Sequence, residues 1–179
     1  MLTHRLANLN DLPDLHQLMD RAMRRFLPDF LDAEQVKASY EIMGVDSRLI
    51  EDGTYFVVLA DNQLAGCGGW SRRETLFGGD HSSGRNPRRL HPATEPARVR
   101  AMYTNPNHAR QGIGRLILQL CEEAAQAEGF QAVELAATAA GVPLYEACGY
   151  TPIKKWNEIT SNKTPVPLVL MGKQLRRNQ

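Results

Sequence analysis

Residues 98–129 read RVRAMYTNPNHARQGIGRLILQLCEEAAQAEG. They predict a strand that ends at Pro106, a loop that contains Gly112 and Gly114, and an amphipathic helix that stops at Gly129. The helix is indicated by apolar side chains at the spacing of one buried face, namely Ile113, Leu116, Ile117, Leu120, Cys121 and Ala124. We expect the rest of the chain to be organised around this strand, loop and helix.

The start of this helix is suited to an anion. Its first amide groups have no partner inside the helix, and the aligned peptide dipoles leave roughly half a positive charge there. Gly112 and Gly114 let the backbone approach a ligand closely, and Arg110 and Arg115 add positive charge. The spacing is neither that of the nucleotide P-loop nor that of the dinucleotide fingerprint. Taken alone, the pattern fits a phosphate cradle and an ordinary strand-to-helix turn equally well.

Length and composition predict a single domain over residues 1–179. The formal net charge is +1, so no overall field favours nucleic acid or an anionic membrane as a partner. No apolar run reaches the roughly 20 residues that span a bilayer, and no secretory leader follows Met1. We therefore expect a cytoplasmic location.

The cysteines and arginine clusters are expected to be structural. Cys67, Cys121 and Cys148 lack the spacing of a metal site and lie among apolar neighbours, which is typical of core residues. The arginine clusters are expected to be solvated surface, and they comprise Arg72 with Arg73, Arg85 with Arg88 and Arg89, Arg98 with Arg100, and Arg176 with Arg177. The alternative is that the basic residues of segment 72–96 favour an anionic binding partner.

The chain before residue 52 predicts one strand and two helices. The strand is expected over residues 3–7. The first helix would begin at Asp11, whose side chain would cap it, and its apolar face runs to Phe26. The second helix is expected from Asp32 towards Met43.

A β-hairpin is predicted next. Segments 54–60 and 64–70 are rich in strand-forming residues and flank the turn signal Asp61–Asn62. Glycines at 66, 68 and 69 indicate a bulge or the close approach of another backbone.

Segment 72–96 is a long polar loop, which is predicted to be either functional or disordered. Its histidines, His81 and His91, do not have the spacing of metal ligands. After the helix that ends at Gly129, a strand is expected over residues 131–137, a short helix over 142–148, and two further strands at 151–153 and 166–173.

The order of these elements, with two motifs, resembles the GNAT superfamily of N-acetyltransferases, which use acetyl-coenzyme A. The first motif is Met102–Pro106 followed by Ala109–Gly114, which resembles the cofactor strand and pyrophosphate loop of the family. The second is Leu144–Tyr150, which is similar to the family's hydrophobic, Tyr, Glu, two residues, Gly, aromatic signature. The two motifs are separated by about 30 residues that contain one strand.

The resemblance implies an α+β, three-layer fold with a mixed, mostly antiparallel sheet of about 6–7 strands, helices on both faces, and a splay at the cofactor strand. A loop insertion is expected at 72–96. The implied ligand is acetyl-CoA as cosubstrate, with no metal. The residues expected to contact it are Met102, Tyr103, Thr104, Arg110, Gln111, Gly112, Ile113, Gly114, Arg115 and Thr138. Two positions depart from the family pattern, since Ala109 stands where Arg or Gln is usual and Thr138 stands where Asn is common.

By the same resemblance, the chain would transfer an acetyl group to a primary amine of a small molecule or peptide by direct attack in a ternary complex. Tyr145 would be the general acid that protonates the leaving thiolate. The base is open among Glu134, Glu95, His81 and Tyr103. The alternative function is a non-catalytic acyl-CoA sensor, and an RNA- or DNA-binding domain is the least favoured. A homodimer is compatible with the resemblance.

Overall fold

The computed structural model describes residues 1–176, so Arg177 of the C-terminal arginine pair lies outside the described residues. A seven-stranded sheet in the order β1-β2-β3-β4-β5-β7-β6 forms the middle layer. Its strands are β1 (Leu2–Leu6), β2 (Tyr55–Ala60), β3 (Gln63–Ser71), β4 (Ala97–Thr104), β5 (Ala132–Thr138), β6 (Thr151–Ile159) and β7 (Pro165–Gln174). Within residues 1–176, β4 and β5 form a parallel pair and the other neighbours are antiparallel.

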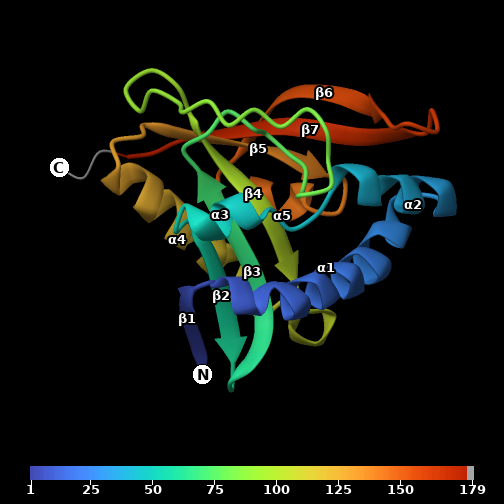
Figure 1. Cartoon of the computed structure of the whole chain (residues 1–179), viewed down its shortest axis with the longest axis horizontal. Helices are drawn as coiled ribbons and strands as arrows, with labels where there is room; N and C mark the ends of the chain where they lie inside the picture. The colour runs from blue at the N-terminus through green and yellow to red at the C-terminus, as the bar shows by residue number, and fades with distance from the viewer. Residues whose placement is uncertain (177–179) are drawn as a thin grey trace.

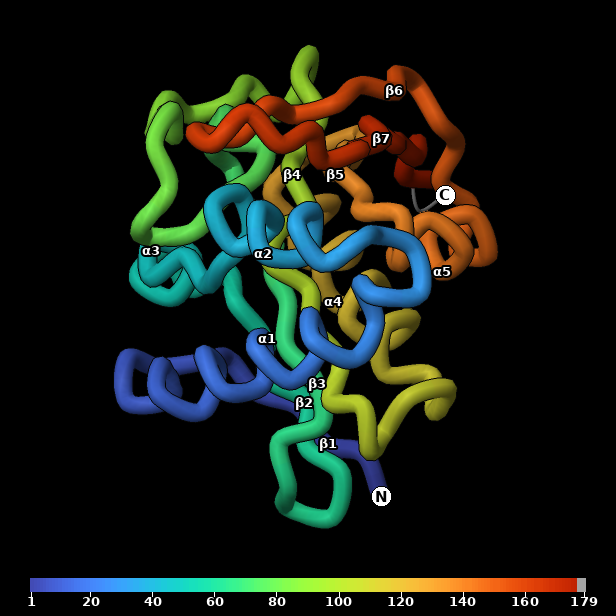
Figure 2. The backbone as a smooth tube through the Cα atoms, turned by 90° about the vertical axis from the view of Figure 1, so that its right-hand side faces the viewer, coloured from blue at the N-terminus to red at the C-terminus, as the bar shows by residue number. Residues whose placement is uncertain are grey.

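Helices cover both faces of this sheet, as Figures 1 and 2 show. One apolar core lies between α1 and strands β2 to β4, and a second lies between α4 and strands β2 to β5. In Figure 2, α1 and α2 cross in front of the sheet and α4 runs behind it. The helices are α1 (Leu12–Phe26), α2 (Ala33–Ile42), α3 (Ser47–Glu51), α4 (Ile113–Ala127) and α5 (Val142–Ala147). The predicted fold class is therefore confirmed.

Helix α4 packs unusually close to β3 because β3 lacks side chains at the contact. A Cβ atom at Gly68 would lie 2.7 Å from Cγ2 of Ile117, and one at Gly66 would collide with Ile113. The strand register also shifts between Cys67 and Gly69. The glycines were predicted to allow a bulge or the approach of another backbone. A bulge in β3 is found where its register with β2 shifts between Val58 and Leu59, and another backbone comes close at Gly69, where a Cβ would lie 2.5 Å from the Thr54 carbonyl oxygen. At Gly66 and Gly68 the nearest neighbours are side chains of α4 and Met102.

Several predicted boundaries need correction. Asp11 does not cap α1 with its side chain, because its carboxylate instead accepts from the Asn8 amide at 2.8 Å and pairs with Arg5 at 2.8 Å. Helix α3 was not predicted; it has five residues and too few apolar positions to show a period. Strand β6 continues to Ile159, well past the expected Ile153, and most of its side chains are exposed.

The long segment between β3 and β4 contains no helix or named strand within the described residues. It is anchored to the body by the buried side chain of Leu90 and by the ion pair of Arg73 with Asp52 at 2.7 Å, and an isolated bridge between Arg73 and Arg89 joins its two ends. The guanidinium of Arg88 contacts Glu74 and Glu95, each at 2.7 Å. These contacts brace the loop internally, and the Gly78 carbonyl accepts from Arg100 of β4 at 2.6 Å, which holds residues 76–78 at the pocket described below.

Candidate active site

The loop before α4 has the backbone of an anion site. Arg110 and Gly112 both adopt left-handed conformations, with φ of 65° and 79°. The first amide of this region with a protein acceptor is that of Leu116, which donates to the Gly112 carbonyl at 3.0 Å. Within residues 1–176, the amides of residues 110–115 donate to no protein acceptor. Consecutive free amides at the positive end of a 15-residue helix form a concave donor surface that suits a phosphate.

The two glycines of this loop have different roles. A Cβ at Gly112 would meet no atom within 4 Å, so its side-chain position faces open space next to the free amides. A Cβ at Gly114 would lie 2.5 Å from Cδ2 of Leu144. We expected both glycines to clear room for an anion. The structure gives Gly114 a packing role, because its lack of a side chain lets α5 approach the first turn of α4.

Strand β4 carries a bulge at the centre of the site. Gly69 pairs with Arg100 and Cys67 pairs with Tyr103, so β4 has one more residue than β3 over this interval. Ala101 absorbs the extra residue with φ of 51°, a conformation that costs an L-residue about 1–2 kcal/mol. The fully buried hydroxyl of Tyr55 donates to the Ala101 carbonyl at 2.6 Å and holds the bulge.

The bulge directs neighbouring side chains to opposite faces. Tyr103 packs into the core under α1, where its hydroxyl donates to the Gly44 carbonyl at 3.3 Å. Met102 packs on the other face, toward Tyr145. The Tyr103 backbone pairs with Cys67 of β3, so neither its backbone nor its side chain is turned toward the open edge of β4.

Strands β4 and β5 separate immediately after they meet. They pair only at Ala97 with Val133 and at Arg98 with Glu134, where the side chains form an ion pair of 2.8 Å. The Asn105 amide donates to Ala65 of β3 at 2.8 Å. Because backbone groups alternate along a strand, those of Thr104 and Met102 then face the gap toward β5. The expected splay at the cofactor strand is confirmed.

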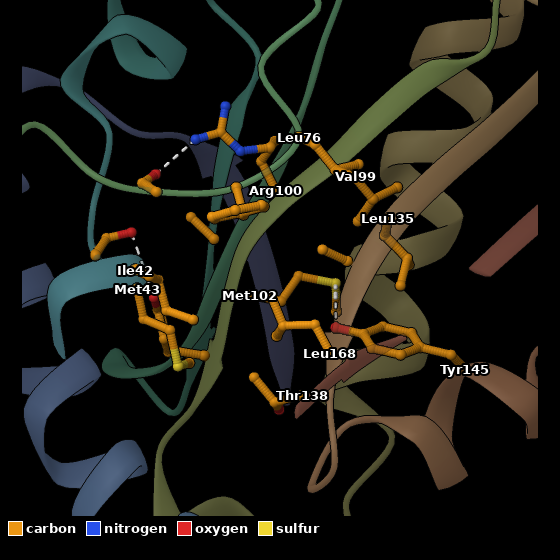
Figure 3. A pocket seen from close by; sticks show the side chains of 16 residues that line it. Ile42, Met43, Leu76, Val99, Arg100, Met102, Leu135, Thr138, Tyr145 and Leu168 are labelled. Carbon is orange, nitrogen blue, oxygen red and sulfur yellow. Dashed lines mark hydrogen bonds between the residues drawn. The ribbon is translucent and has the colours of Figure 1, made fainter. Parts of the chain in front are cut away.

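Tyr145 projects from α5 into a pocket of about 80 Å³ between β4 and β5 (Figure 3). Its hydroxyl contacts Sδ of Met102 at 4.0 Å, and its ring meets that of Tyr150 edge-on with centroids 5.9 Å apart. Burial raises the pKa of Tyr145 to about 12. The phenol is therefore protonated at neutral pH, and the weak sulfur acceptor leaves it available to donate.

The other predicted contact residues fall into three groups. Arg110, Gln111 and Arg115 have exposed side chains around the loop. Ile113 is buried in the core, so that only its backbone can face a ligand. Thr138, at the end of β5, lines the pocket with Tyr145.

Of the four residues considered as a base, Tyr103 lines the pocket. Its burial raises its pKa. The other three have partners of their own. Glu134 pairs with Arg98, Nε2 of His81 lies 2.6 Å from the Tyr40 carbonyl, and Arg88 lowers the pKa of Glu95 to about 2.

Arg100 is the residue that sequence reasoning missed. It was grouped with Arg98 as solvated surface, and that expectation is wrong, because Arg100 is 3% exposed and lines the pocket beside the bulge. Its Nη2 donates to the Gly78 carbonyl at 2.6 Å (Figure 3) and to Asp46 at 3.1 Å. The partners that bury Arg100, Asp46 and the Gly78 carbonyl, are distant from it in the sequence and leave no signal within β4.

The far end of the pocket is formed by the chain that follows α2. Ile42, Met43 and Gly44 lie opposite Met102 and Tyr145 (Figure 3). Phe77 of the long loop also lines this wall.

Comparison with known proteins identifies the family. The profile of the acetyltransferase (GNAT) family matches residues 13–150. A comparison with curated protein sequences finds no significant match. Among residues 1–176, no helix is both long and apolar enough to cross a bilayer.

Solved structures share the fold. A GCN5-related N-acetyltransferase from Rhodopseudomonas palustris has a TM-score of 0.72 at 13% identity, over 97% of this chain and 95% of that one. A PaiA N-acetyltransferase from Thermoplasma acidophilum, in complex with coenzyme A, has a TM-score of 0.64 at 14% identity, over 97% and 99%. The putative acetyltransferase YncA from Salmonella typhimurium, with acetyl-CoA, has 0.64 at 17% identity, over 99% and 95%. Since the family profile spans most of the sequence, the chain belongs to the GNAT family of acetyltransferases.

Proposed function

We propose that this chain transfers an acetyl group from acetyl-CoA to a primary amine of a small molecule or peptide. The proposal rests on one observation, which is that the free amides and the Tyr145 pocket both adjoin the open edge of β4. The open edge of β4 has the free amides of residues 110–115 at one end and the pocket with the Tyr145 hydroxyl beside its middle.

The chain's own residues fit acetyl-CoA in three ways. The amides of residues 110–115, with Arg110 and Arg115 nearby, would bind the pyrophosphate. The backbone groups of Met102 and Thr104 would pair with the amides of an extended pantetheine arm, as an added strand would. The pocket between Met102 and Thr138 would then receive the acetyl end.

The transfer step is direct. The amine nitrogen of the acceptor attacks the carbonyl carbon of the thioester, the C–N bond forms, and the C–S bond breaks. Tyr145 would donate its phenolic proton to the departing sulfur, and the acceptor nitrogen would lose a proton to solvent or to a base in the pocket. Holding the two reactants in one pocket would supply a large part of the rate.

A thiol-release assay with acetyl-CoA and a panel of primary amines tests this function. Release that depends on the amine supports transfer. Calorimetric binding of acetyl-CoA without release for any amine would instead indicate an acyl-CoA sensor. Failure of acetyl-CoA to bind would contradict both functions.

A further inference from the structure

A second cavity, of about 210 Å³, lies on the other side of Arg100 from the Tyr145 pocket. It is formed by α3, the end of β3 and the loop that follows, and Arg100 lines both cavities. The charged side chains that line it are mostly positive, namely Arg48, Arg73, Arg85 and Arg100, with Asp46 as the one carboxylate among the lining residues.

The donors around this cavity exceed the available acceptors. Arg100, although buried, uses only Nη2 for its bonds to Asp46 and Gly78, and within residues 1–176 its Nε and Nη1 have no protein acceptor. Nε of Arg85 is buried and also has no partner. The nearest carboxylate to Arg48 is Glu51, at 3.8 Å. A buried donor left unpaired, such as Nε of Arg85, is costly, and Nε and Nη1 of Arg100 are also free to donate, so this arrangement favours a ligand that accepts hydrogen bonds.

The carboxylates nearby are already engaged. Asp46 accepts from Arg85 at 3.0 Å and from the Arg48 amide at 3.0 Å through Oδ1, and from Arg100 through Oδ2. Asp52 holds Arg73 in a two-point contact of 2.7 and 2.9 Å. Arg85 also approaches Asp80, at 3.5 Å. Asp46 is therefore shared by two guanidinium groups, and Arg48 has only its 3.8 Å contact with Glu51, so the arginines that line the cavity keep donors for a further anion.

Arg100 lies between this cavity and the pocket in which the acetyl transfer is proposed to occur. Arg100 lies two residues before Met102 on β4, and Met102 contacts the Tyr145 hydroxyl. A molecule with a planar anionic group beside Arg100 could place its other end in the Tyr145 pocket. Guanidinium groups bind carboxylates through paired hydrogen bonds in a fixed geometry.

We propose that the arginine-lined cavity binds a carboxylate carried by the acceptor amine, so that the chain favours amines that also bear a carboxylate. This inference rests on the proposed acetyltransferase function and names its acceptor class. It assigns the basic residues of the loop after β3 to substrate selection.

The test uses a series of ω-amino acids of increasing length, each compared with its carboxamide. In the unmodified protein, kcat/KM for the best carboxylate should exceed that for its amide at least tenfold. Arg48→Gln and Arg85→Gln should reduce this ratio toward one. Arg25→Gln is the matched control, because Arg25 also pairs with a nearby carboxylate, that of Asp29, but lies outside the cavity, and it should keep the ratio.

A binding measurement separates this proposal from the function on which it rests. Calorimetry with succinate should detect binding that Arg48→Gln weakens and Arg25→Gln does not. If no amine is acetylated while this binding persists, the site stands and the acetyltransferase function fails. If amines are acetylated with no carboxylate preference, the proposal is overturned. Inorganic phosphate that binds through Arg48 without competing with a carboxylated acceptor would also overturn it, by assigning the cavity to a free anion.

Discussion

Replacement of Tyr145 by phenylalanine is the most direct test of the chemistry proposed here. The change removes one oxygen and keeps the ring that packs against Tyr150. That oxygen contacts only the sulfur of Met102 within residues 1–176, at 4.0 Å, so its loss should alter the free energy of unfolding by less than about 1 kcal/mol. General acid catalysis contributes about 10²–10⁴ in rate, which corresponds to about 2.7–5.4 kcal/mol of barrier.

We therefore expect Tyr145→Phe to lower kcat by about two to four powers of ten, with little change in the Kd for acetyl-CoA. The assay is thiol release at saturating substrates, together with calorimetry and thermal unfolding. Tyr150→Phe is the matched control, because its hydroxyl is buried without a partner and plays no part in the proposed step. An unchanged kcat in Tyr145→Phe, at saturation and with an intact fold, would refute the acid role.

Three further predictions concern the loop, its packing and the buried thiols. Gly112→Glu should abolish calorimetric binding of acetyl-CoA by placing a carboxylate at the free amides, whereas Gly84→Glu, with a similar φ of 77° and an equally open site, should retain it; retained binding in Gly112→Glu would contradict the phosphate cradle. Gly114→Ala should lower the free energy of unfolding by about 1–3 kcal/mol, because its Cβ would lie 2.5 Å from Leu144. Urea titration should show a smaller loss when Leu144→Val is also present, and equal losses would argue against this contact. Stability should also decline as pH rises from about 9 to about 12, because burial raises the pKa of Cys67 from 9.0 to about 12 and the unfolded chain releases this proton first. Denaturant midpoints measured from pH 8 to 11 would contradict this if they rose.

Elements with strong periodic patterns were predicted well from the sequence. The helix after Gly112 was expected to stop at Gly129, and α4 ends at Ala127 with Gly129 in a left-handed conformation. The hairpin turn at Asp61–Asn62 is confirmed by positive φ at both residues. Both signals are local, since a buried face or a tight turn depends on residues that are close in the chain.

The features that shape the site depend on distant contacts and were not predictable in the same way. The bulge at Ala101 is held by Tyr55, which lies 46 residues earlier in the chain. The burial of Arg100 requires Asp46, which caps the start of α3, and Gly78 of the long loop. No pattern within β4 itself distinguishes such an arginine from a solvated one.

The cysteines illustrate a prediction that composition alone could support. Cys67 is fully buried in the core under α1, and Cys121 is fully buried in the core under α4. Cys148 is half-buried against the core that contains Cys121, as expected for apolar packing. Free cysteine behaves as a small hydrophobic residue, so its neighbours in the sequence were sufficient to place it.

The brief pairing of β4 with β5 has a thermodynamic consequence. It divides the sheet into a four-strand half that carries Arg100 and a three-strand half next to Tyr145, joined by two paired positions and by α4. A ligand bound between the halves would take the place of a strand between β4 and β5. It would thereby align Arg100 on one half with Tyr145 on the other. Each substrate would then raise the affinity of the other by the same factor, because linkage between binding sites is reciprocal. In such a molecule, cooperativity between cosubstrate and acceptor would arise within one sheet.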